Sequence, residues 1–407
     1  MAVSIVEAFD ILDHRIASLS TEMVPIEESL GRTVASDYTA SFNLPRFDNS
    51  AMDGYAVKCD NEGGCASSST VIYAGDKSHY RLQKGEAIRI MTGAPVPEGC
   101  EAIVPIEEVQ IDGAEITLPE TVRPHAHIRY AGEDLKQGET YLRTGETITA
   151  YTLALLASQG ITHIAVTRRV RVAVFGTGDE LRPHYERIEA HQLYNSNAPM
   201  FLARAKELGC DVHYIGGSGD TIDSLKSCIR EALDADLIIT SGGVSVGDKD
   251  FTKEAFTELG METFFSGIAI KPGKPTTIGS IGKTMIVNLP GNPLASMVNY
   301  ELFVKFIIRK LSGSASPYHS FVETRIKESH TLRQGRYTTI LGSYDGSGFL
   351  PLPQQSPGMV SPLPQADGLI ITLPDVSSLE KGAIVKMLPI KWEISASERK
   401  DIFTASS

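Results

Sequence analysis

The sequence has few cysteines, and no two of them stand in a metal-binding spacing. Its 407 residues include five cysteines, none of which forms a C-x-x-C motif. An odd number of cysteines in a chain of this length does not describe the framework of a small disulfide-rich domain. We therefore expect reduced thiols and a cytoplasmic protein.

Long apolar runs and an excess of positive charge are also missing. No apolar segment reaches the roughly 18 residues of a membrane-spanning helix. The first segment, MAVSIVEAFDILDHR, carries acids where a secretory signal carries bases. Lys and Arg number 38 against 50 Asp and Glu, and the net charge of -12 repels a phosphate backbone. We expect no membrane span and no nucleic-acid partner.

The composition is otherwise that of a globular protein, with 42% hydrophobic and 22% charged residues. At about 100–200 residues per domain, the length corresponds to two to four domains. A capping-box pair, Ser4 and Glu7, precedes apolar residues at spacings of three and four, which predicts a helix over 5–19. A second helix is predicted over 149–160, and we expect it to pack on the first.

The regions between and after these helices have distinct textures. Residues 25–147 contain short β-type runs broken by glycine and proline, with an Asp-Gly hairpin signal at 112–113. Between 170 and 311, strands alternate with helices, which predicts a parallel sheet covered on both faces. Short strands return after 317 and predict a small β-barrel or sandwich.

The predicted fold class is therefore multidomain α/β plus β. Its four parts are a discontinuous N-terminal helical/β domain (1–40 with 125–168), an all-β insertion domain (41–124), an α/β three-layer domain (169–312) and a small C-terminal β-barrel domain (317–395). Parallel sheets bind ligands at the carboxyl ends of their strands, and those ends here carry the loops FGTGDEL, SGGVSVGDKD and NLPGNP.

Acidic and hydroxyl side chains concentrate in three loops. Asp53 follows PRFDNSAM, and Thr92 stands in MTGAP; both segments also suit plain turns. Glu180 lies in FGTGDEL, which lacks the third glycine of a dinucleotide-binding motif. A carboxylate in that loop suits a divalent cation such as Mg²⁺, which commonly bridges one or two carboxylates to substrate phosphates.

The string SGGVSVGDKDF is the most unusual in the chain. Ser241, Gly242 and Gly243 allow backbone N–H groups to approach an anion closely, and Asp250 adds a carboxylate. The pattern fits a phosphorylated ligand carried with Mg²⁺. Asp220 stands at a predicted helix start, where helix capping is the simplest account, although it also follows a strand end.

A basic pair stands on a rigid turn near the end of the α/β region. Lys271 and Lys274 flank the Pro-Gly turn of AIKPGKP, which makes a tetrahedral-oxyanion site plausible in an acidic chain. In NLPGNPLAS, Pro290 and Pro293 fix the turn into the next helix, and Ser296 follows in its first turn.

In this order, DNSAMDGYAV, IMTGAPVP, AGEDL, FGTGDEL, SGGVSVGDKDF, AIKPGKP and LPGNP resemble the motifs of the molybdopterin molybdenumtransferase family, which includes the bacterial MoeA proteins and the E domain of gephyrin. The resemblance covers essentially the whole chain. It implies a homodimer with a molybdopterin-binding α/β domain. The implied reaction inserts molybdate, as co-substrate, into adenylylated molybdopterin with Mg²⁺-dependent release of AMP, and contacts with an adenylyltransferase and with apo-molybdoenzymes would follow.

The resemblance also assigns roles to residues. Those implied as catalytic are Asp53, Thr92, Glu180, Asp220 and Asp250, of which Asp53, Glu180 and Asp250 would bind the metal. Those implied to bind the pterin substrate are Asp134, Ser241, Gly242, Gly243, Ser245, Pro290 and Pro293. Those implied to bind molybdate are Lys271, Lys274, Ser296, Arg336 and Ser361, with Ser356 as the alternative to Ser361.

Two other readings stay open. A molybdopterin adenylyltransferase would resemble residues 170–311, but it would leave the N-terminal motifs and the C-terminal strands unexplained. A scaffold that has kept the fold without the chemistry has no reason to keep the acids and lysines. The sequence does not separate molybdate from tungstate, because both are tetrahedral oxyanions of nearly equal size.

Overall fold

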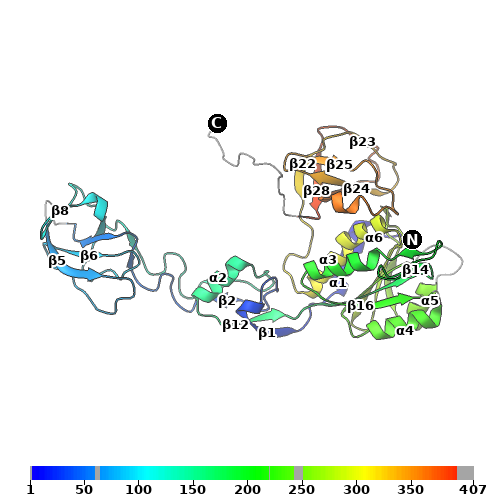
Figure 1. The fold of residues 1–407 in the computed structure, drawn as a ribbon, viewed down its shortest axis with the longest axis horizontal. Helices are drawn as coiled ribbons and strands as arrows, with labels where there is room; N and C mark the ends of the chain where they lie inside the picture. Colours follow the sequence, from blue (N-terminus) through cyan, green and yellow to red (C-terminus); the bar gives the residue numbers. More distant parts are fainter. Residues whose placement is uncertain (1, 60–64, 220, 243–250, 392–407) are drawn as a thin grey trace. The chain divides into compact units, whose positions relative to one another are not determined.

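The computed structural model describes residues 2–59, 65–219, 221–242 and 251–391 (Figure 1). The chain divides into two compact units. The first comprises Met1–Ala35, Gly145–Thr149 and His163–Ser407, and the second comprises Ser36–Thr144 and Ala150–Thr162. The predicted four-part division is finer than these two units and stays a prediction.

A six-stranded mixed sheet forms the centre of the first unit, in the order β16-β13-β17-β21-β20-β18. Its strands are β13 (Arg171–Thr177), β16 (Asp211–Ser218), β17 (Leu237–Ser241), β18 (Glu262–Ser266), β20 (Thr277–Ile281) and β21 (Thr284–Leu289). Strands β16, β13, β17 and β21 are parallel, as predicted. Strands β20 and β18, which the sequence did not predict, pair antiparallel, so the sheet as a whole is mixed. The physical reason is a two-residue turn at Gly282 (φ 58°), which returns the chain directly from β20 into β21.

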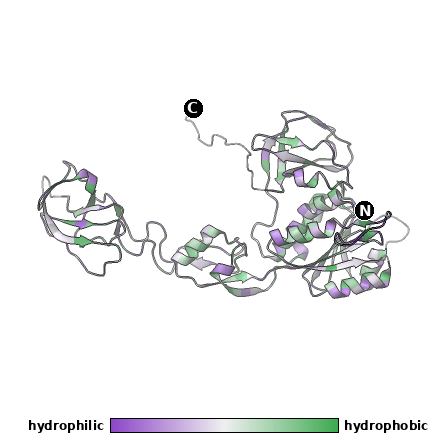
Figure 2. Ribbon diagram, viewed as in Figure 1, coloured by the Kyte–Doolittle hydropathy of each residue, from purple (hydrophilic) through white to green (hydrophobic). Residues whose placement is uncertain are grey.

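Helices cover both faces of this sheet. They are α3 (Asn197–Glu207), α4 (Ile222–Ala232), α5 (Phe251–Glu258) and α6 (Pro293–Asn299), which continues through a π-helical turn η3 (Tyr300–Val304) into α7 (Lys305–Leu311). Alternate residues of β13 enter two separate cores, Val174 on the side of α3 and α6 and Phe175 on the side of α4 and α5. Figure 1 shows these helix pairs on opposite sides of the sheet, and Figure 2 shows α3 and α4 with both hydrophobic and hydrophilic turns.

The first helix, α1 (Ile5–Arg15), has the predicted capping box at Ser4 and Glu7. It buries its apolar face in the core of the first unit, where the Phe9 ring lies 5.3 Å from that of Phe303 and 5.1 Å from that of Phe306. The second helix, α2 (Ala150–Ser158), belongs to the second unit. The prediction that the two share a core is therefore wrong, because periodicity identifies the buried face of a helix but not its partner.

The C-terminal residues of the first unit form a closed β-barrel, as predicted. Its strands are β22 (Val322–Arg325), β24 (Tyr337–Tyr344), β25 (Phe349–Pro351), β26 (Gly368–Thr372) and β28 (Ile384–Pro389), joined by β19 (Ile270–Lys271) from the α/β region. The barrel closes where Ile326, just after β22, bridges to Phe349 at the start of β25. Smaller elements of this unit are β1 (Thr21–Pro25), η1 (Ile26–Glu28), β12 (His163–Thr167), β14 (Leu181–Arg182), β15 (Leu193–Tyr194), β23 (His330–Thr331), η4 (Leu363–Gln365) and β27 (Ser378–Leu379).

The second unit is built mainly of strands. Its six-stranded sheet has the order β7-β4-β6-β5-β9-β8, made of β4 (Gly54–Val57), β5 (Cys65–Ile72), β6 (Glu86–Ile90), β7 (Ala102–Pro105), β8 (Gln110–Asp112) and β9 (Glu115–Thr117). Strands β8 and β9 form the predicted hairpin, with Gly113 at φ 60°. The remaining elements are β2 (Tyr38–Thr39), β3 (Asn49–Ser50), η2 (Ile106–Glu108), β10 (Ile128–Arg129), β11 (Thr140–Leu142) and α2.

Two findings concern disulfide bonds and membrane-spanning helices. Among the cysteines whose side chains are described, Cys59, Cys100, Cys210 and Cys228, none forms a disulfide. Within the same described ranges, none of the helices has the length and apolar character needed to cross a membrane.

Candidate functional site

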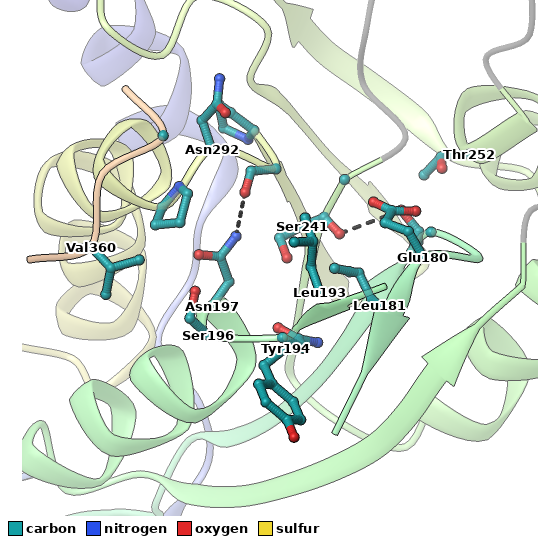
Figure 3. Close-up of a pocket in the computed structure, with 18 of the residues that line it drawn as sticks. Glu180, Leu181, Leu193, Tyr194, Ser196, Asn197, Ser241, Thr252, Asn292 and Val360 are labelled. Atoms are coloured by element: carbon teal, nitrogen blue, oxygen red, sulfur yellow. Dashed lines mark hydrogen bonds between the residues drawn. The ribbon is translucent and has the colours of Figure 1, made fainter. Parts of the chain in front are cut away.

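A pocket of about 890 Å³ opens at the carboxyl ends of the parallel strands, where the sheet was expected to bind its ligand. Its polar lining comes from the ends of β13 and β17, the start of α3 and α5, and the turn that follows β21: Thr177, Glu180, Asn195, Ser196, Asn197, Ser241, Thr252 and Asn292. Figure 3 shows Glu180 at one end of the pocket and Val360, from the barrel, at the other. The volume lies within the range of small-molecule sites.

Two glycines let the strand ends come together at this pocket. Gly242 has φ 97°, and a Cβ atom on it would lie 2.4 Å from the Thr177 carbonyl oxygen. Gly178 has φ 140°, and a Cβ atom there would lie 2.5 Å from Glu180 Oε2. At Gly242 a side chain would collide with backbone, whereas at Gly178 it would meet only the end of the flexible Glu180 side chain, and there the positive φ angle is what favours glycine. The exposed carboxylate of Glu180 lies close to Gly178, in the lining of the pocket.

The start of α3 holds one wall of the pocket in place. Asn195 Oδ1 accepts a hydrogen bond from the Ala198 N–H over 3.0 Å and so caps the helix. Asn197, only 5% exposed, donates from Nδ2 to the Gly291 carbonyl oxygen over 2.8 Å (Figure 3). The turn after β21 is thereby fixed against α3. Sequence reasoning missed both asparagines, although an Asn-Ser-Asn string at a helix start is a capping signal.

A second, smaller pocket of about 180 Å³ adjoins the first, and Pro275, Pro290 and Asn292 belong to both linings. The charged side chains that line it are Lys271, Lys274 and Arg336, all exposed, and none of the described lining residues is an acid. Within the described parts of the chain, none of these three cations forms an ion pair within 4.0 Å. We call it the cation pocket. It brings together three of the residues implied to bind molybdate, and that role stays a prediction.

Strand pairing brings the cation pocket together from distant segments. Strand β19 pairs in parallel with β24, so that Lys271 lies opposite Thr338, two residues after Arg336. The turn after Lys271 is packed tightly on α6. At Gly273, which has φ 110°, a Cβ atom would lie 1.9 Å from Asn299 Nδ2, and this nitrogen donates to the Gly273 carbonyl oxygen over 3.2 Å.

The serines expected at the oxyanion site lie elsewhere. The Ser296 side chain is fully buried, and its hydroxyl donates to the Pro293 carbonyl oxygen over 3.0 Å. The preceding residue, Ala295, is the one that lines the cation pocket. Successive helical residues point about 100° apart, so a one-residue difference decides which side chain faces a ligand. Neither Ser356 nor Ser361 is among the lining residues of the two pockets, although Pro357 lines the cation pocket.

Three of the predicted residues lie in the second unit. Asp53 Oδ1 accepts hydrogen bonds from the backbone N–H and from the hydroxyl of Thr92, each over 2.7 Å. These two bonds hold the pKa of Asp53 below its ordinary value. Two residues given separately as catalytic are therefore in contact, and their catalytic roles stay a prediction. Asp134 is exposed, and its backbone N–H donates to the Leu44 carbonyl oxygen over 3.0 Å.

Four predicted site residues, Asp220, Gly243, Ser245 and Asp250, lie outside the described residues. Of the predicted pterin-binding residues in the first unit that are described, Ser241, Gly242, Pro290 and Pro293 line the large pocket. No group of three or more His, Cys, Asp or Glu side chains within the described ranges is placed to hold a metal ion by itself.

Comparison with known proteins places these features in one family. The model of the MoeA N-terminal region (domain I and II) matches residues 3–160, the probable molybdopterin binding domain matches 173–310, and the MoeA C-terminal region (domain IV) matches 324–390. The molybdopterin molybdenumtransferase 2 of Mycobacterium tuberculosis is 37% identical over 328 residues, which cover 77% of this chain and 80% of that protein. The chain belongs to the molybdopterin molybdenumtransferase family.

Two further proteins are similar over three quarters or more of the chain. The Haemophilus influenzae molybdopterin molybdenumtransferase is 37% identical over 312 residues, 75% of this chain and 77% of that protein. The solved structure of a molybdopterin biosynthesis MoeA protein from Pyrococcus horikoshii is 29% identical, covers 97% of this chain and all of that one, and superposes with a TM-score of 0.82. The resemblance of the sequence motifs to this family is therefore confirmed, as is the multidomain α/β plus β fold class.

Proposed function

We propose that this protein inserts molybdate into adenylylated molybdopterin and releases AMP, the last step of molybdenum cofactor synthesis. The observation that carries the proposal is the pair of adjoining pockets. A large pocket at the carboxyl ends of the strands lies next to a small one whose described lining has three cations and no acid, and the two share the turn from Pro290 to Asn292. This arrangement suits two substrates that must meet: a pterin nucleotide and a tetrahedral oxyanion.

The charges of the cation pocket match a dianion. Lys271 and Lys274 present ammonium groups and Arg336 a guanidinium group, which together offer several N–H donors to the oxygens of molybdate. Since none of the described lining residues is an acid, none of them competes with the oxyanion for these donors. The same donors serve tungstate equally.

The large pocket suits the pterin nucleotide. Gly242 and Ser241 offer close backbone approach for a phosphate, and Pro290 and Pro293 shape the opposite wall. A bound Mg²⁺ would neutralise phosphate charge during cleavage of the phosphoanhydride. One or two carboxylates with substrate phosphates suffice for Mg²⁺, so the exposed Glu180 fits the role of its protein ligand.

Asp53, in the second unit, is the next residue to which we assign a role. Because its pKa is lowered by the two hydrogen bonds from Thr92, Asp53 is charged at neutral pH and has Oδ2 available for a cation or for the substrate. We assign Asp134, Asp220, Gly243, Ser245 and Asp250 to the substrate site, and Asp250 also to the metal site, on the resemblance of their motifs alone.

The wider biochemical setting is part of the same proposal. The family resemblance suggests a cytoplasmic homodimer that receives adenylylated molybdopterin from an adenylyltransferase and passes the cofactor to apo-molybdoenzymes. The reading as an adenylyltransferase is disfavoured, because family models match the chain on both sides of its molybdopterin-binding region.

The experiment that tests the function is AMP release from adenylylated molybdopterin by the purified protein with Mg²⁺, with and without molybdate, followed by reconstitution of an apo-molybdoenzyme. AMP release that depends on molybdate, together with an active molybdoenzyme, would support the proposal. Substrate binding without any AMP release would favour the scaffold reading.

A further inference from the structure

The turn between the two pockets carries one polar side chain, Asn292. It belongs to the linings of both the large pocket and the cation pocket, and it is exposed. Figure 3 shows its carboxamide pointing away from Asn197, which holds the other side of the turn through the Gly291 carbonyl oxygen. Asn292 therefore stands where ligands in the two pockets would come closest to each other.

The Asn292 carboxamide does not serve its own helix. The residue occupies the N-cap of α6, where an asparagine oxygen usually accepts a hydrogen bond from the first turn, but its side chain makes no such bond. The N–H of Leu294 donates instead to the Pro357 carbonyl oxygen over 3.0 Å. The helix start is thus satisfied in part by the barrel, and the carboxamide is left available to a ligand.

Asn292 is also distinctive in the cation pocket. Besides Lys271, Lys274 and Arg336, the described lining consists of apolar residues, prolines, a glycine and Asn292 itself. The Ser296 hydroxyl, which the sequence predicted as a neutral donor, is turned into the helix. Among the described lining residues, the Asn292 amide is the one neutral side-chain donor in reach of an oxyanion held there.

We propose that Asn292 is a binding residue of the oxyanion site and donates a hydrogen bond from Nδ2 to the tetrahedral oxyanion at the boundary of the two pockets. This inference rests on the proposed function, because it assumes that the oxyanion occupies the cation pocket. A neutral donor on the side of the large pocket orients the oxyanion toward the pterin nucleotide without adding to the charge that the three cations already supply.

Direct titration of the full-length protein with molybdate or tungstate, without the pterin substrate, tests this role. Asn292→Asp replaces the donor with an anion of the same shape, and we expect it to weaken oxyanion binding at least about tenfold. Asn292→Ala removes one neutral hydrogen bond, and we expect a weakening of about 2- to 10-fold. Gln354→Glu is the matched control: it makes the same change of charge at an exposed residue outside both linings, and its affinity should equal that of the unmodified protein.

The outcomes separate this inference from the proposed function. Wild-type affinity in Asn292→Asp, together with weakened binding in Lys271→Ala, would overturn the role of Asn292 and leave the oxyanion site in place. An absence of molybdate binding in the unmodified protein would overturn both. The exposed Asn292 side chain makes no capping bond, so urea unfolding of Asn292→Asp should match that of the unmodified protein, and a loss of affinity with unchanged stability supports the inference.

Discussion

Arg204 on α3 forms a two-point ion pair with Glu301 in the π-helical turn. Its Nε atom lies 2.7 Å from Glu301 Oε1, and its Nη2 atom lies 3.0 Å from Oε2. The Glu301 side chain is 6% exposed, and Lys305 Nζ lies 3.6 Å from the same Oε2 atom. The helix that begins at one wall of the large pocket is thus tied to the helix that begins at the Pro290–Asn292 turn.

We expect Glu301→Ala to lower the free energy of unfolding by about 3–5 kcal/mol, because it leaves the buried Lys305 without this carboxylate and removes the buried partner of the half-buried Arg204. Urea denaturation followed by circular dichroism measures the change. The control is Glu207→Ala, which removes the exposed partner of the same Arg204 and should cost less than about 1 kcal/mol. Equal losses of unfolding free energy in the two variants would show that the Arg204–Glu301 ion pair contributes no more stability than the Arg204–Glu207 pair.

The second prediction concerns the carboxylate of the large pocket. Glu180→Gln keeps the shape of the side chain but removes its charge, so we expect Mg²⁺-dependent AMP release to fall by about 100-fold or more with the fold intact. Asp179→Asn changes the neighbouring acid, which does not line the pocket, and should retain activity. A normally active Glu180→Gln protein would remove this residue from the mechanism.

The third prediction concerns the cation pocket. Lys271→Ala combined with Lys274→Ala should raise the molybdate concentration needed for half-maximal AMP release by about 100-fold or more, because two charge-assisted hydrogen bonds are lost. Binding of adenylylated molybdopterin, measured by calorimetry, should not change. Lys283→Ala, on the exposed β20–β21 turn, is the control for the loss of surface charge. An unaltered molybdate requirement in the double variant would place the oxyanion elsewhere.

Thiol reactivity gives a fourth prediction. Burial raises the pKa of Cys210 to about 12 and that of Cys100 to about 11. Only the thiolate reacts, and raising the pKa lowers its fraction near pH 8, where an ordinary thiol of pKa about 8.5 is partly ionised. Iodoacetamide labelling followed by peptide mass spectrometry should therefore be at least about 100-fold slower at these two cysteines than after unfolding in urea. Rapid labelling of Cys210 in the folded protein would contradict its burial.

The fifth prediction separates backbone strain from a steric clash. Gly242 and Gly260 both have positive φ angles, 97° and 81°, but a Cβ atom would meet Thr177 only at Gly242, and nothing lies within 4 Å of the corresponding position at Gly260. We expect Gly242→Ala to cost about 1–3 kcal/mol more than Gly260→Ala and to weaken binding in the large pocket. Urea denaturation and calorimetric titration with AMP measure the two effects. Identical free energies of unfolding for the two variants would mean that the ends of β13 and β17 can move apart without loss of stability.

The sequence predicted the elements of the first unit where hydrophobic patterns were long and regular. The runs around Val174 and Ile239 are continuously apolar, as strands buried on both faces must be, and they form the parallel centre of the sheet. Strands β18 and β20 escaped prediction because they are short, contain threonine, serine and glycine, and lie toward the edge. The surface on which α1 packs was predicted wrongly for a different reason. The apolar stripe of a helix can pack on any large apolar surface, so the sequence does not specify which one.

For the site, chemistry was easier to predict than geometry. A basic pair on a rigid turn indicated an anion site, and the structure confirms that Lys271 and Lys274 line one pocket. The sequence alone could not pair β19 with β24, because contacts between distant segments leave no local periodicity. Ser296 was assigned to the oxyanion site by the resemblance of its motif, and the rotation of the helix instead brings Ala295 to the pocket.

The parallel pairing of β19 with β24 also limits how the protein can move and evolve. A two-residue strand from the α/β region forms the edge of the barrel sheet, so the barrel cannot swing away as a hinged lid without breaking that pairing. A slip of one residue would turn Lys271 to the opposite face of the sheet and separate it from Arg336. The barrel is therefore not an interchangeable module: a chimaera that takes it from a relative must take the strand that carries Lys271 along with it.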